Sequence, residues 1–99
     1  MELFIIVRFH AHEGLQDDVA AALREVVPPT RAESGCLAIE AFAASRDPRV
    51  FYIHSRWVDE AAFDHHATLP HTVRFIERVQ TLINHPLEVV RVRPLGIVT

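Results

Sequence analysis

The stretch that decides the fold is residues 50–58, which read Val-Phe-Tyr-Ile-His-Ser-Arg-Trp-Val. Aromatic and β-branched residues dominate it, which is typical of a β-strand. Because side chains alternate between the two faces of a strand, the more apolar set should lie on the buried face. This set consists of Phe51, Ile53, Ser55 and Trp57. The opposite face then carries Tyr52, His54 and Arg56.

Turn and capping signals flank this strand on both sides. Before it, Arg46-Asp47-Pro48 separates it from a short apolar run at 36–44, so the two runs predict a hairpin. After it, Asp59 is a good N-cap for a helix over 60–67. Pro70 suits the first turn of a further helix that ends near residue 84, and alternating residues at 87–93 predict a last strand.

The N-terminal third supplies one strand and one helix. Residues 3–10 form a β-rich run, and apolar residues recur at helical spacing from Leu15 to Val26. Pro28-Pro29 should end or kink this helix, because neither proline can donate a helical N–H, and a short helical turn over 30–33 would follow. The order β-α-β-β-α-α-β predicts one α+β domain over residues 1–99. It is a ferredoxin-like split β-α-β sandwich, a four-stranded antiparallel sheet with helices on one face.

Composition excludes several classes of protein. With 99 residues, 49% hydrophobic, and a net charge of −3, the chain is not a globally basic nucleic-acid-binding protein. Its one cysteine, Cys36, excludes a disulfide framework and a multi-cysteine metal site, which indicates a structural thiol in a reducing cytoplasm. Arg8 and His10 end the apolar N-terminal run too early for a signal peptide or a membrane-spanning helix, so we expect no membrane contact.

The face of the sheet away from the helices mixes apolar and charged residues. Its apolar members are Phe4, Ile6, Ala38, Phe42 and Tyr52. Its charged members are Arg8, Glu40 and Arg56, with His54 beside them. A solvated outer face is the simple explanation, but monomers rarely expose so large an apolar patch. We therefore expect a homodimer that packs sheet to sheet. Its interface would hold Tyr52, Phe42 and a paired cluster of Arg8, Glu40 and Arg56, since buried charges must pair.

Several short motifs together resemble the antibiotic biosynthesis monooxygenase family. They are residues 51–57, Asp59-Glu60-Ala61, the spacing His66-(four residues)-His71, Val7-Arg8-Phe9 and residues 33–37. The resemblance covers nearly the whole chain. It implies a dimeric α+β barrel with a pocket between the sheet and the helices of each protomer. The best-known members oxygenate phenolic or quinol-like aromatics with molecular oxygen, without metal or flavin, whereas others degrade haem or isomerise a phosphorylated autoinducer-2 sugar.

The resemblance implies catalytic roles for His66 and Trp57. His66 matches a histidine common in the family, and an imidazole that titrates near neutral pH is a suitable general base beside a phenol. A helix-terminal histidine stabilised by the helix dipole is the structural alternative. Trp57 would form a stacking wall whose indole N–H donates to a substrate oxygen, and plain core packing is its alternative.

Further residues would line the pocket, and no metal or other cofactor is predicted. The substrate contacts would be Ser55, Ile53, Phe63, Phe9 and His71, although His71 also suits capping and packing between two helices. His65 and His66 are adjacent on a helix and point about 100° apart, so they cannot readily chelate one ion together. The first strand lacks the asparagine of the haem-degrading branch.

The sequence therefore predicts a cofactor-independent monooxygenase that acts on a small aromatic substrate and molecular oxygen. Two alternatives stay open. One is an isomerase or lyase for a small phosphorylated or keto compound of the autoinducer-2 type, although His54-Ser55 replaces the Tyr-Glu pair of that branch. The other is a non-catalytic ligand-binding dimer. An enclosed pocket that contains His66 and a polar partner would favour chemistry, whereas a collapsed apolar cleft would favour binding alone.

Overall fold

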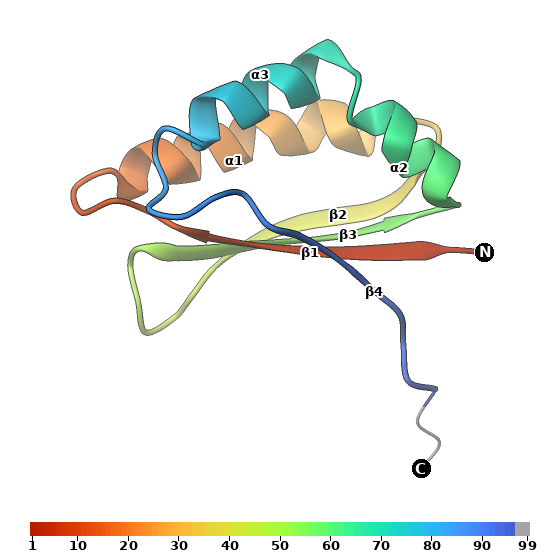
Figure 1. Ribbon diagram of the computed structural model, residues 1–99, viewed down its shortest axis with the longest axis horizontal. Helices are drawn as coiled ribbons and strands as arrows, with labels where there is room; N and C mark the ends of the chain where they lie inside the picture. Colours follow the sequence, from red (N-terminus) through yellow and green to blue (C-terminus); the bar gives the residue numbers. More distant parts are fainter. Residues whose placement is uncertain (97–99) are drawn as a thin grey trace.

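The computed structural model describes residues 1–96 of the chain and has two layers, a sheet and a layer of helices (Figure 1). In chain order the elements are β1 (Leu3–His10), α1 (Gln16–Arg31), β2 (Cys36–Ala43), β3 (Val50–Trp57), α2 (Glu60–His66), α3 (Pro70–Val79) and β4 (Val89–Val92). The strand order is β2-β3-β1-β4, and each neighbouring pair is antiparallel. All three helices cover the same face of the sheet (Figure 1). This arrangement confirms the predicted α+β ferredoxin-like fold.

The core lies between the sheet and the helices, and the alternation predicted for the central strands is confirmed. In β3 the predicted set Phe51, Ile53, Ser55 and Trp57 is buried, and Val50 at the start of the strand is buried as well. In β1 they are Leu3, Ile5, Val7 and Phe9. Helix α1 packs onto them with Val19, Leu23 and Val26. Burying one such aliphatic side chain contributes about 1.5–3 kcal/mol, so this shared apolar layer holds the helices to the sheet.

Strand β2 departs from simple alternation at its start. Cys36 pairs with Trp57 and Ala38 pairs with Arg56, so Leu37 is an extra residue in a β-bulge. The bulge shifts the alternation, and the side chain of Leu37 is 41% exposed. Strict alternation along 36–44 predicts that Leu37 faces the helices with Ile39 and Ala41, and this prediction is wrong for Leu37.

Helix α1 continues through Pro28-Pro29 to Arg31, so the predicted end of the helix at this step is wrong. The two prolines cost the helix two N–H donors, but the turn around them is held by burial of Val27 and Thr30. The carbonyl of Pro28 also accepts the N–H of Ala32 at 3.2 Å. Packing therefore outweighs local propensity at this step, and no separate helical turn is formed over residues 30–33.

Helix α3 is shorter than predicted. It ends at Val79, and the chain then turns so that Ile83 forms an isolated β-bridge with Ala11. Ile83 is buried in the core in that position. Strand β4 is correspondingly short and pairs with β1 alone. Within residues 1–96, none of the helices combines the length and the apolar character that a membrane crossing requires.

The outer face of the sheet is open in the single protomer. Ile6 and Phe42 on this face are 38% and 50% exposed. Arg8, Glu40 and Arg56 do not pair with one another within the described protomer. Instead Glu40 pairs with Arg31 at 3.6 Å and Arg56 pairs with Glu2 at 3.3 Å.

Candidate active site

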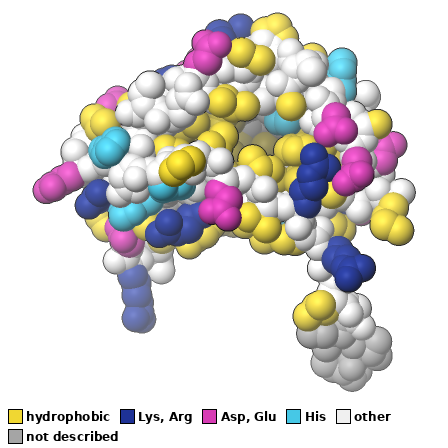
Figure 2. All heavy atoms as spheres, viewed as in Figure 1, with side chains coloured by type: hydrophobic (Ala, Val, Ile, Leu, Met, Phe, Trp, Pro, Cys, Tyr) yellow, Lys and Arg dark blue, Asp and Glu magenta, His cyan; other side chains and the backbone are white. Residues whose placement is uncertain are grey.

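A cavity of about 360 Å³ lies between the sheet and helices α2 and α3. Figure 2 shows a hollow on this side of the molecule that is walled largely by hydrophobic side chains. The sheet contributes Ile5, Val7, Phe9, Ile39, Ile53, Ser55, Val89 and Arg91 to the lining. The helices and loops contribute Val26, Phe63, His66, Ala67, Thr72, Phe75, Ile76 and Leu87. The lining is thus apolar apart from two hydroxyls, one imidazole and one guanidinium, which suits a flat apolar ligand.

The structure brings together most of the predicted site residues. The five that line the cavity are Phe9, Ile53, Ser55, Phe63 and His66. Trp57 and His71 lie outside the lining. Both are nevertheless attached to it, Trp57 through its contacts with Ser55 and His66, and His71 through a shared carboxylate.

Trp57 supports the cavity from behind. Its side chain is 1% exposed, and its indole N–H donates to Ser55 Oγ at 3.0 Å. Its ring contacts Phe63 edge-on, with centroids 5.5 Å apart, and His66, with centroids 4.7 Å apart. The ring is buried against Phe63 and His66 of α2 and Ser55 already accepts its N–H, so the free donor predicted for Trp57 is wrong and the alternative of core packing fits its position.

The side chain of His66 is fixed by Glu33, which precedes β2. His66 Nδ1 lies 2.7 Å from Glu33 Oε2, and Thr72 Oγ1 lies 3.1 Å from the same nitrogen. The His66 side chain is 12% exposed and that of Glu33 is 11% exposed. Because a carboxylate only accepts hydrogen bonds, His66 carries its proton on Nδ1 when neutral. The lone pair is then on Nε2, the nitrogen left for a molecule in the cavity.

Burial lowers the pKa of His66 below its usual value, although the hydrogen bond and the charge of Glu33 oppose this shift. At neutral pH the ring is therefore uncharged and can accept a proton. A neutral imidazole that is oriented by a buried carboxylate is the arrangement used by general bases in many enzymes.

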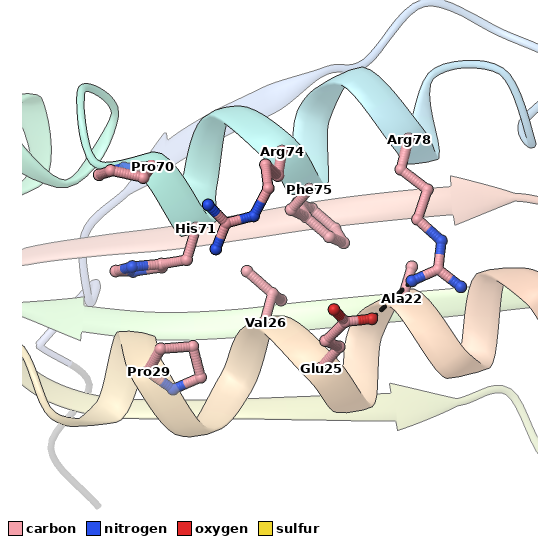
Figure 3. A pocket seen from close by; sticks show the side chains of 9 residues that line it. All are labelled: Ala22, Glu25, Val26, Pro29, Pro70, His71, Arg74, Phe75 and Arg78. Atoms are coloured by element: carbon pink, nitrogen blue, oxygen red, sulfur yellow. Dashed lines mark hydrogen bonds and ion pairs between the residues drawn. The ribbon is translucent and has the colours of Figure 1, made fainter.

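His71 belongs to the same hydrogen-bonded group, but its side chain lines the groove between α1 and α3 and not the cavity. Its Nε2 lies 2.7 Å from the same Glu33 Oε2. Figure 3 shows His71 with Pro29 and Arg74 along the groove between α1 and α3. Phe75 and Val26 line both this groove and the cavity, whereas His71 lines the groove alone. The prediction of a direct substrate contact for His71 is not supported by this placement, since α3 directs the ring away from the cavity lining.

Glu33, His66 and His71 are also the group that could hold a metal, since their ligand atoms lie within 4.8 Å of one another. The two N···O distances of 2.7 Å have the length of charge-assisted hydrogen bonds. Two ligand atoms of a tetrahedral zinc ion, with bonds of about 2.0 Å, would lie about 3.3 Å apart. In this structure the three side chains are therefore linked by shared protons. The role of Glu33 was missed because 33 residues separate it from His66 in the sequence.

Arg91 of β4 lines the edge of the cavity. Arg91 donates to Glu60 at 3.0 Å and to Asp64 at 3.3 Å, and its guanidinium lies 5.4 Å from the ring centroid of Phe63. It thereby ties β4 to helix α2, which has no fully buried residue, at the edge of the cavity.

Burial raises the pKa of the Cys36 thiol, with a smaller contribution from the charge of Glu33. A protonated thiol fits the structural role predicted for it.

Gly35 allows α2 to approach the loop that carries Glu33. A Cβ at this position would overlap the Cβ of Ala62 in α2. We expect Gly35→Ala to push α2 outward and to lower the free energy of unfolding by about 1–3 kcal/mol, the usual cost of overpacking. Urea unfolding followed by circular dichroism measures this effect, with the exposed neighbour Ser34→Ala as the control. Equal midpoints for Gly35→Ala and wild type would show that the contact is unimportant.

Comparison with known proteins agrees with this architecture. The chain is 29% identical over 91 residues to the "Putative monooxygenase Rv0793" of Mycobacterium tuberculosis, covering 92% of this chain and 89% of that protein. The solved structure of Rv0793 matches with a TM-score of 0.90 at 25% identity and covers 100% of both chains. The structure of PA3566 from Pseudomonas aeruginosa has a TM-score of 0.88 at 28% identity, covering 96% of this chain and 95% of that one. Residues 3–78 match the family described as Antibiotic biosynthesis monooxygenase, and the chain therefore belongs to this family.

Proposed function

We propose that the protein is a monooxygenase that oxidises a small phenolic or quinol-type aromatic with molecular oxygen and without a cofactor. The observation that carries the proposal is the cavity, in which apolar walls surround one neutral imidazole bonded to a buried carboxylate. Such a site can hold a flat ring and remove one proton from it. The family match and the name of the Mycobacterium tuberculosis relative support the reaction class.

The reaction begins with the transfer of a proton from the substrate hydroxyl to His66 Nε2, and Glu33 stabilises the imidazolium that forms. The phenolate then passes one electron to oxygen, and the resulting radical and superoxide combine to form a carbon–oxygen bond at the ring. The His66 imidazolium returns its proton to this peroxide, and loss of water, which takes up the hydrogen of the oxygenated ring carbon, gives a quinone. One substrate and one O₂ thus yield one oxygenated product and one water, and the substrate supplies all of the electrons.

Ser55 provides a second polar contact for the substrate. Its Oγ accepts the indole N–H of Trp57, so its own hydroxyl proton is free to donate to a substrate oxygen. The remaining walls are largely apolar, so a bound substrate would displace water from them and limit side reactions of the radical and peroxide intermediates. In this way the substrate is held between a donor on β3 and an acceptor on α2.

An oxygen electrode tests the proposal directly. Purified protein is supplied with a panel of hydroquinones, naphthols and other small phenols, and the rate of oxygen uptake is compared with that of buffer alone. We expect uptake above the buffer rate for at least one member, with a quinone as the product. Equal rates with and without protein across the whole panel would refute the enzymatic function.

The pH dependence of the reaction follows from the lowered pKa of His66. Because the neutral ring is the active form, kcat/KM should rise with pH through the pKa of His66 and then level off. The midpoint of this rise is expected below pH 6.5, the ordinary value for histidine, so the enzyme should already be near its plateau at neutral pH. A pH profile of kcat/KM measures this midpoint, and a midpoint well above 6.5 would contradict the assignment.

We also infer that two protomers pack sheet to sheet as a cytoplasmic homodimer. The exposed Phe42 and Ile6 support the interface, and the free thiol of Cys36 suits a reducing compartment. Sedimentation at micromolar concentration should give the mass of two chains for the wild type and of one chain for Phe42→Asp. Val73→Asp on α3, which is also exposed, should remain dimeric. A monomeric wild type would contradict the inference.

A further inference from the structure

We propose that His71 is a positioning residue that holds Glu33 in place for His66, rather than a contact for the substrate. This proposal rests on the proposed function, in which His66 is the base. The three side chains come from three separate segments: the loop after α1, the end of α2 and the start of α3. Their convergence on one carboxylate oxygen is the observation that requires an explanation.

Both imidazoles bond to the same atom. Glu33 Oε2 lies 2.7 Å from His66 Nδ1 and 2.7 Å from His71 Nε2. A carboxylate oxygen has two lone pairs and no proton to give, so both ring nitrogens must donate. The two donors fill the hydrogen-bonding capacity of this oxygen, which fixes the tautomer of each ring. His71 therefore bears its proton on Nε2, whereas His66 bears its proton on Nδ1.

The burial of the group explains why a second donor is needed. The Glu33 side chain is only 11% exposed, and a buried carboxylate is costly unless hydrogen bonds satisfy it. Without His71, Glu33 would keep one of these two donors, and its carboxylate would be freer to rotate. A carboxylate that rotates away no longer holds the His66 proton on Nδ1, so the proton can move to Nε2 and remove the lone pair from the cavity.

The position of His71 separates its role from substrate binding. Its ring lies in the groove between α1 and α3 with Arg74 and Pro29, and it is absent from the cavity lining (Figure 3). A change at His71 should therefore alter the catalytic step and leave the substrate contacts intact. In kinetic terms, kcat should fall while KM stays close to the wild-type value.

The test compares two substitutions of His71 with a neighbour in the same groove. His71→Leu removes the donor, whereas His71→Gln keeps an N–H that can reach Glu33. Arg74→Ala, one turn further along α3, is the control, since Arg74 lines the same groove. We expect His71→Leu to lower kcat about tenfold, the effect of one hydrogen bond of ordinary strength, with KM within twofold of wild type. His71→Gln should retain most of the activity, and Arg74→Ala should match wild type.

Long-range ¹H–¹⁵N NMR gives a readout that does not depend on turnover. In the wild type, the nitrogen shifts should show His66 protonated on Nδ1, and in His71→Leu a fraction of His66 should be protonated on Nε2. An unchanged tautomer and an unchanged kcat in His71→Leu, or a raised KM with kcat unaffected, would overturn the positioning role. If the wild type consumes no oxygen with any substrate, the proposed function fails, and the nitrogen shifts alone then decide whether His71 fixes the tautomer of His66.

Discussion

His66→Ala is expected to lower kcat by about 10²–10⁴-fold, the usual contribution of a general base. The substitution removes the only imidazole among the residues that line the cavity in the described chain. Without it, the substrate must lose its proton to water, and the neutral phenol is much harder to oxidise than its anion. Oxygen uptake under saturating substrate measures the effect, because saturation separates the chemical step from binding.

His65→Ala is the matched control for this experiment. His65 is the preceding residue of α2, but its side chain is exposed and lies outside the cavity lining. We expect it to leave kcat within about twofold of wild type, as is typical of surface substitutions. Since His66 also contacts Trp57, circular dichroism must show that His66→Ala is folded. A folded His66→Ala variant with wild-type kcat would exclude His66 as the base.

Trp57→Ala is expected to have the largest effect on stability. The side chain is 1% exposed and packs on Phe63 and His66, so its removal leaves a large void under the cavity. Deletion of a buried aromatic side chain costs about 3–5 kcal/mol, which is a large part of the total of about 5–15 kcal/mol for a small domain. Urea unfolding followed by circular dichroism is the appropriate measurement, because Trp57 is the only tryptophan and its fluorescence is lost in the variant.

Trp57→Phe separates packing from hydrogen bonding in the same position. It keeps an aromatic ring but removes the N–H that Ser55 accepts. We expect a smaller loss of about 1–3 kcal/mol from reduced volume and the lost bond. An unfolding midpoint for Trp57→Ala close to that of wild type would show that the ring does not support the cavity in the way described.

The sequence predicts the fold well where local pattern and burial agree. In β3, the alternation of Phe51, Ile53, Ser55 and Trp57 identifies the buried face, because one face of the sheet packs against helices. Local rules fail where packing overrides them. The Pro28-Pro29 step stays helical because the surrounding turn is buried, and the bulge at Leu37 follows from pairing with β3, which the local pattern cannot show.

The site could be predicted only in part, for a related reason. Strand alternation and the family resemblance predict pocket positions for His66, Phe63 and Ser55, and all three line the cavity. Glu33 belongs to the segment 33–37 that resembles the family, but the sequence assigns it no role, since it meets His66 only through the tertiary fold. The position of His71 is a second example. The sequence predicts a substrate contact, but the ring lies in the groove between α1 and α3, because the packing of these two helices decides where it points.

The most direct test of the central claim is the fate of the two atoms of O₂. The wild-type protein is supplied with ¹⁸O₂ and the most active phenol of the panel, and the product is reduced at once to its quinol to prevent exchange with water. Mass spectrometry should then show one ¹⁸O atom per product molecule, with the second atom in water and no hydrogen peroxide formed. A product without label, accompanied by hydrogen peroxide, would contradict the account.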